Sequence, residues 1–100
     1  MTACQPISIV PSRERHAALR LNERYGLAFT LDLKVELFRQ IEAARVNDNR
    51  APMACRINAY GDRERWLVSI DHRIVHVVIN PAATVVVTFL PLHGPTAGHP

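Results

Sequence analysis

The spacing of the hydrophobic residues changes once along the chain, and this change limits the folds that the chain can adopt. Up to about residue 46 the apolar residues recur every three or four positions, as on one face of a helix. From Met53 onward they alternate with polar residues, as in a strand with one buried face. The segment between these regions, Asn47 to Pro52, has the composition of a turn. Helices followed by strands predict an α+β fold.

Two helices are predicted in the N-terminal half. Ser12 is a suitable N-cap for a helix over 13–25, and Gly26 fits the left-handed position that ends it. Thr30 can cap a second helix over 31–46. Each helix has one apolar face, formed by Ala17, Ala18, Leu21 and Tyr25 in the first and by Leu33, Leu37, Ile41 and Ala44 in the second. The short connection predicts a helical hairpin.

Four strands are predicted in the C-terminal half, over 53–60, 66–71, 73–80 and 84–90, with turns at GDRE and NPAA. Short connections favour antiparallel neighbours in chain order. The predicted fold is therefore two N-terminal helices packed on a four-stranded antiparallel sheet. Strict alternation places Arg56 and Tyr60 together on the face opposite Cys55.

The length of 100 residues allows one domain, which we expect over 12–91. Residues 1–11 predict an extended arm or a short edge strand, and residues 92–100 predict a disordered tail. We see no secretory signal, and polar residues interrupt the apolar tract from Ile74 to Leu90. The two cysteines do not have the spacing of a zinc site or a disulfide scaffold. We therefore expect a cytoplasmic protein without a membrane, metal or cofactor requirement.

Arginine carries nearly all of the positive charge. Lys34 is the single lysine among 12 basic residues, and the formal net charge is +3. Because the arginine side chain presents a planar fork of donors, this bias favours contact with polyanions. A GC-rich genome would produce the same bias without any function, so composition alone does not decide between these two explanations.

The sequence RERHAALRLNERYG, residues 13–26, contains the strongest candidate for a chemical site. His16 and Arg20 lie four residues apart on one helix face. A neutral histidine can take a proton from a ribose 2′-hydroxyl, and a neighbouring arginine can stabilise the charge that develops on the phosphate. The alternative interpretation is a solvated helix flank in which arginines pair with Glu14 and Glu23.

Two segments suggest a family. The opening helix RHAALRLNERYG and the closing strands WLVSIDHRIVHVVINPAATVVVTFLP resemble those of RelE/ParE-like toxins and related small metal-independent nucleases of the barnase, EndoU, colicin and RelE type, in particular small phage- and prophage-encoded relatives. The resemblance covers about residues 12–91. It implies an endoribonuclease that uses 2′-hydroxyl attack, with His16 as the proton carrier, Arg20 neutralising the phosphate and Thr88 contacting it.

Four further residues are candidates for RNA binding: Arg13, Arg24, Arg56 and Tyr60. The chain departs from the RelE pattern because lysine is nearly absent and the C-terminal tail has no charge apart from histidine. This departure argues against ribosome-dependent cleavage.

RNA is thus the first predicted partner, and a toxin of this kind would also bind a cognate antitoxin. The alternative is a non-enzymatic phage-type module that binds a host protein complex through the arginine-rich helix or an exposed sheet edge. A homodimer formed through the fourth strand or the N-terminal arm is compatible with either function.

Overall fold

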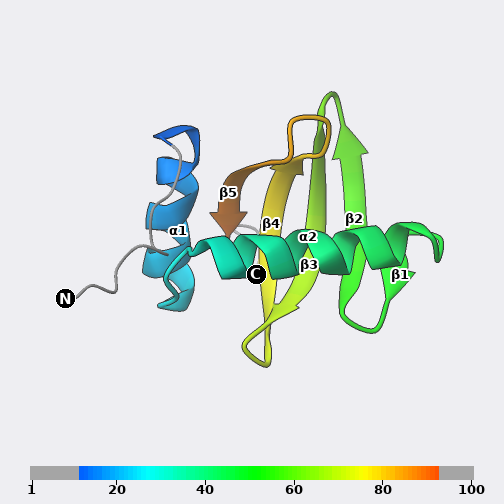
Figure 1. The fold of residues 1–100 in the computed structure, drawn as a ribbon, viewed down its shortest axis with the longest axis horizontal. Helices are drawn as coiled ribbons and strands as arrows, with labels where there is room; N and C mark the ends of the chain where they lie inside the picture. The colour runs from blue at the N-terminus through cyan, green and yellow to red at the C-terminus, as the bar shows by residue number, and fades with distance from the viewer. Residues whose placement is uncertain (1–11, 93–100) are drawn as a thin grey trace, which may run out of the picture.

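The chain folds into two helices and a five-stranded antiparallel sheet, as a computed structural model that describes residues 12–92 shows (Figure 1). The predicted α+β class is confirmed. The predictions for the arm and for the last eight residues of the tail lie outside the described residues. In chain order the elements are η2 (Ser12–Glu14), α1 (Arg15–Tyr25), α2 (Leu31–Arg45), β1 (Arg50–Ala51), β2 (Ala54–Tyr60), β3 (Arg63–Ile70), β4 (Arg73–Asn80) and β5 (Val85–Leu90).

The sheet has the predicted meander order but one more strand than predicted. Asp48 and Asn49 have φ angles of 63° and 62°, in the left-handed region that short polar residues adopt most readily. This turn brings the two residues of β1 back onto β2, where Arg50 pairs with Cys55. The segment predicted as a turn up to Pro52 therefore contains a short edge strand.

Two strand boundaries also differ from the sequence prediction. The turn between β2 and β3 contains only Gly61 and Asp62, so that Arg63 and Glu64 belong to β3. The turn between β4 and β5 extends through Thr84, whose φ of 54° is incompatible with a strand. A tight glycine turn lengthens one strand, and a left-handed threonine shortens another.

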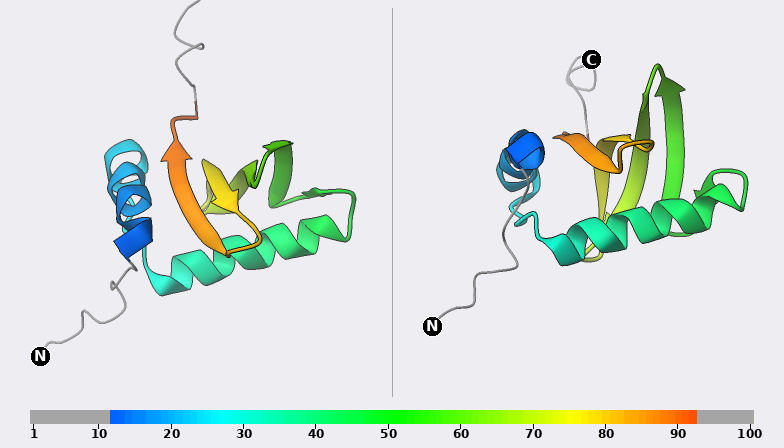
Figure 2. Two further views of the ribbon diagram at one scale, coloured as in Figure 1. Left: turned by 90° about the horizontal axis from the view of Figure 1, so that it is seen from above. Right: turned by 45° about the horizontal axis from the view of Figure 1, so that its top comes forward.

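Both predicted helix boundary signals near residues 26 and 30 are confirmed. Gly26 has a φ of 67° and donates its N–H to the carbonyl of Asn22 at 2.9 Å. Thr30 Oγ1 accepts the N–H of Leu33 at 3.1 Å. The predicted helical hairpin is wrong, because α1 packs along β5 while α2 lies across the sheet at a steep angle to α1 (Figures 1 and 2). Each helix finds its apolar partner in the sheet.

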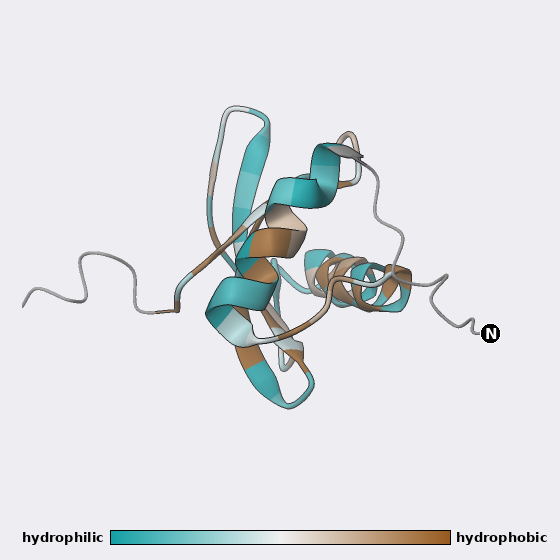
Figure 3. Cartoon of the chain, turned by 90° about the vertical axis from the view of Figure 1, so that its left-hand side faces the viewer, coloured by the Kyte–Doolittle hydropathy of each residue, from teal (hydrophilic) through white to brown (hydrophobic). Residues whose placement is uncertain are grey.

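One hydrophobic core joins both helices to a single face of the sheet. Both helices carry hydrophobic and hydrophilic residues (Figure 3), and the predicted apolar positions of α1 and α2 are buried or partly buried against the sheet. Trp66, Val77 and Phe89 are fully buried in this core, and Phe29 packs edge-on against Phe89 with ring centroids 5.7 Å apart. No helix in residues 12–92 is long and apolar enough to cross a membrane.

Side chains from η2 and α1 satisfy the backbone of β5. Glu14 Oε2 accepts the N–H of Val86 at 2.8 Å, and Arg24 Nη1 donates to the carbonyl of Phe89 at 2.7 Å. The hydroxyl of Tyr25 accepts the N–H of His76 and donates to the carbonyl of Leu90. The contacts of Glu14 and Arg24 use backbone groups of the edge strand that could otherwise pair with another chain, and Tyr25 bridges β4 to β5.

Candidate nucleic-acid interface

The register of the strands assigns each side chain to one of two faces. Neighbours along a strand point to opposite faces, and paired residues on adjacent strands share a face. The covered face holds Trp66, with its partner Val77, and packs against the helices. The open face holds Leu67, with its partner His76, and points away from α2 (Figure 2).

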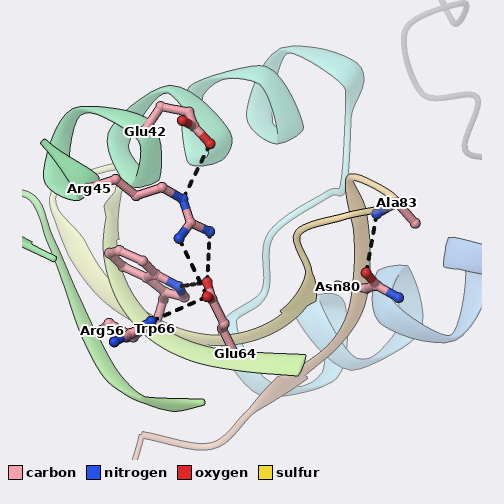
Figure 4. A network of polar contacts seen from close by, with 7 residues as sticks. All are labelled: Glu42, Arg45, Arg56, Glu64, Trp66, Asn80 and Ala83. Atoms are coloured by element: carbon pink, nitrogen blue, oxygen red, sulfur yellow. Dashed lines mark hydrogen bonds and ion pairs between the residues drawn. The ribbon is translucent and has the colours of Figure 1, made fainter. Parts of the chain in front are cut away.

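On the covered face, Glu64 is the centre of a polar network (Figure 4). Arg45 of α2 donates to its carboxylate at 2.7 and 3.4 Å, Arg56 donates at 3.3 Å, and the indole N–H of Trp66 donates at 2.9 Å. Glu42 lies 3.4 Å from Arg45, and the guanidinium of Arg45 stacks over the Trp66 ring at 5.5 Å. The charges of this network therefore pair with one another.

The protonation states of the network follow from these contacts. Burial by itself raises the pKa of Glu64, but the hydrogen bonds from Arg45 and Trp66 outweigh burial and lower it. The hydrogen bond to Glu64 likewise raises the pKa of Arg45. Both groups are charged near neutral pH, as a structural ion pair between α2 and β3 requires.

The open face has a different charge distribution. Glu64 is the single carboxylate in the five strands, and it lies on the covered face. Three strand arginines lie on the open face. Arg63 and Arg65 share the face of Leu67 by alternation along β3, and Arg50 pairs with Cys55, the partner of Leu67. Asp62, in the turn beside this face, lies 3.7 Å from Arg63 in an exposed pair that contributes little. The strands therefore present arginine without carboxylate on this side.

Arg65 and His76 form a contact at the centre of the open face. Arg65 Nε donates to His76 Nε2 at 3.2 Å. Only 6% of His76 is exposed. Burial lowers the pKa of His76 and the charge of Arg65 lowers it further, while the hydrogen bond to the Pro91 carbonyl opposes both effects. The ring is therefore neutral near pH 7, with Nδ1 carrying the proton.

The predicted residues of α1 lie on its surface beside β5. His16 is exposed, as the proposed proton carrier must be. Arg20 pairs with Glu23 at 2.6 Å, which is one of the contacts of the alternative interpretation as a solvated flank. Arg24 reaches the backbone of Phe89, the residue next to Thr88. This strip of α1, which includes the exposed Arg13 of η2, therefore borders the last strand.

The prediction that Arg56 and Tyr60 share a face is wrong. A β-bulge between Arg56 and Asn58 shifts the register, so that Arg56 pairs with Trp66 but Asn58 pairs with Arg65. Arg56 consequently lies on the covered face in the Glu64 network. Tyr60 lies on the open face, with 51% of its surface exposed.

Thr88 also lies on the open face, because it pairs with Val78. The structure thus brings Tyr60 and Thr88 to one side of the sheet and separates both from Arg56. Sequence reasoning missed Arg63 and Arg65, whose alternation with Trp66 is visible in RERW once that segment is recognised as strand. Sequence analysis also did not select His76, although it is the one polar residue inside IVHVVI.

Three further carboxylates lie together at another place on the surface. Asp32, Glu36 and Asp71 line a pocket of about 380 Å³ between α2 and the turn that joins β3 to β4. Hydrogen bonds from Arg39 and Gln40 lower the pKa of Glu36 to about 2. This part of the surface repels a polyanion, whereas the strands of the open face carry arginine without carboxylate.

Within residues 12–92, no three side chains of the metal-binding types lie close enough together to hold an ion. The chain was compared with models of protein families, with curated protein sequences and with solved structures, and none of the three comparisons gave a match.

Proposed function

We propose that this protein binds single-stranded RNA on the open face of its sheet, with the α1 strip bordering the bound strand. The charge distribution supports the proposal: three strand arginines lie on the open face, and the single strand carboxylate lies on the other. Tyr60 and the arginine planes offer stacking surfaces for unpaired bases, which a duplex would not expose. The resemblance to RNA-cleaving toxins favours RNA over DNA.

The proposal is tested by the salt dependence of binding. A labelled single-stranded RNA of mixed sequence is titrated with the wild-type protein and with a triple variant, Arg50→Gln, Arg63→Gln and Arg65→Gln. Each phosphate contact contributes about 0.7 to the magnitude of the slope of log K against log salt. Because the triple variant lacks three arginines, we expect the magnitude of its slope to be smaller by about two. A DNA of the same sequence shows whether the 2′-hydroxyl contributes.

A control of equal charge change separates the open face from general attraction. Arg15→Gln, Arg39→Gln and Arg73→Gln remove three exposed arginines that do not lie on the open face. We expect this variant to keep most of the affinity. Equal losses in the two triple variants would show that binding is not localised. No binding by the wild-type protein at low salt would contradict the proposal and favour the host protein complex as partner.

Cleavage of the bound RNA is the second step of the proposal, and the exposure of His16 beside Arg20 supports it. In this step the 2′-oxygen forms a bond to phosphorus and gives its proton to the imidazole of His16. The bond from phosphorus to the 5′-oxygen breaks, and that oxygen takes a proton from water. His16→Ala is expected to abolish cleavage while the melting temperature shifts by only a few degrees. Cleavage at the wild-type rate would remove His16 from the mechanism.

A further inference from the structure

The guanidinium of Arg65 is held in a way that leaves one edge available. Its Nε is used by His76, and the hydrogen bonds and ion pairs among residues 12–92 assign no partner to its two terminal nitrogens. These two nitrogens form the flat fork that binds a phosphate through two parallel hydrogen bonds. By contrast, both terminal nitrogens of Arg45 donate to the carboxylate of Glu64.

His76 fixes the position of the Arg65 side chain through the hydrogen bond between them. Its Nε2 accepts the hydrogen bond from Arg65, and only 6% of the residue is exposed. Its backbone N–H is held by the hydroxyl of Tyr25. Since the ring is buried and anchored, it limits the rotamers of Arg65 and reduces the entropy that Arg65 loses when it binds a ligand.

Thr88 adds a hydroxyl to the same row of the sheet. Val78 pairs with Arg65 on β3 and with Thr88 on β5, so both side chains flank Val78 on the open face. Two strand spacings separate them, which is roughly 10 Å between backbones. The hydroxyl of Thr88 is therefore the polar side chain of β5 in the row that holds Arg65.

We propose that Arg65, positioned by His76, is a bidentate binding site for a backbone phosphate of single-stranded RNA, with Thr88 as an additional donor. This inference rests on the proposed function and specifies which phosphate contact on the open face is preorganised. His76 is a positioning residue, because it acts on the phosphate through Arg65.

Single substitutions at Arg65 test the fork. Arg65→Gln removes the charge and the fork, and Arg65→Lys keeps the charge alone. We expect Arg65→Gln to weaken RNA binding about tenfold and Arg65→Lys to recover little of that loss. The matched control is Arg63→Gln, on the same strand and face but without a histidine partner, for which we expect about a twofold loss. Equal losses in Arg65→Gln and Arg63→Gln would overturn the site.

A double-mutant cycle tests the positioning role of His76. His76→Leu removes the acceptor and should weaken binding in the wild-type background, but it should add nothing to Arg65→Gln. His76→Gln supplies an amide oxygen for Arg65 and an amide N–H for Pro91, so it should restore binding. An equal effect of His76→Leu in both backgrounds, or no rescue by His76→Gln, would overturn the coupling. If His76→Leu does not fold, His76→Ala takes its place in the cycle, because it also removes the acceptor.

The outcomes for this site and for the proposed function are distinct. Wild-type protein that binds RNA with unchanged affinity in Arg65→Gln contradicts the site and leaves the open-face function intact. Wild-type protein that does not bind RNA contradicts both.

Discussion

The arginines on the two faces of the sheet have different partners. On the covered face, Arg45 and Arg56 surround Glu64, so that their charge is used within the protein. On the open face, Arg65 contacts a neutral histidine, which accepts a hydrogen bond but cancels no charge. The same residue type therefore stabilises the fold on one side and is available to an anionic ligand on the other. Position relative to a carboxylate, rather than arginine content, distinguishes the two roles.

Glu64→Gln should have the largest effect on the covered face. It leaves two guanidinium groups near an uncharged amide in a region where only 9% of Glu64 is exposed. We expect a loss of about 2 kcal/mol in the free energy of unfolding, below the range for a fully buried pair because both arginines are partly solvated. Urea denaturation measures it. The control Glu42→Gln, with a 69% exposed side chain, should cost less than about 0.5 kcal/mol. Equal costs would show that the network is not a stabilising centre.

Tyr25→Phe removes the side-chain contact that joins α1 to the backbone of His76. The variant leaves the N–H of His76 and the carbonyl of Leu90 without the hydroxyl that joins them. We expect a loss of about 1 kcal/mol in the free energy of unfolding. Tyr60→Phe, at an exposed position, should leave stability unchanged. Thermal denaturation of the two variants measures both stabilities. A Tyr25→Phe variant as stable as wild type would contradict the bridging role.

Arg56→Gln and Arg65→Gln compare the two faces directly. Arg56→Gln should lower the free energy of unfolding by roughly 1 kcal/mol or less and change the RNA affinity by no more than about twofold. Arg65→Gln should do the reverse, with a large loss of affinity and little loss of stability. Both variants need one urea titration and one RNA titration. If Arg56→Gln weakens RNA binding as much as Arg65→Gln does, the assignment of the two faces is wrong.

The smallest expected effect is on the pH dependence of stability. The pKa of His76 in the folded protein lies below its ordinary value of 6.5. Between these two values the unfolded chain binds a proton that the folded chain does not, so stability is full above about pH 6.5 and falls as the pH drops. His76→Gln should show a flatter decrease between about pH 7.5 and about pH 5.5. An identical slope in both proteins would contradict the neutral state of His76.

The elements of the fold follow from local signals, and the sheet face of each residue does not. Gly26 and Thr30 are recognisable as helix boundary residues because their conformations depend on nearby backbone. The bulge between Arg56 and Asn58 depends on pairing with β3. One inserted residue reverses the sheet face of the residues that follow it in β2. Sequence alternation alone therefore placed Tyr60 with Arg56.

The candidate site depends even more on long-range contacts. The partner of Arg65 is eleven residues away on the next strand, and the partner of Glu64 lies on α2. No spacing rule along the chain identifies which arginine meets a carboxylate. The helix strip of His16 and Arg20 could be predicted because its members are one turn apart.

Amide chemical-shift mapping with isotope-labelled protein and single-stranded RNA shows which strands and helices the RNA contacts. We expect the perturbed amides to cluster on β3, β4 and β5 around Arg65, His76 and Thr88, and those of α2 between Glu36 and Arg45 to stay unchanged. Perturbations confined to α2, or equally large in α2 and in the strands, would contradict the claim that the open face is the RNA-binding surface.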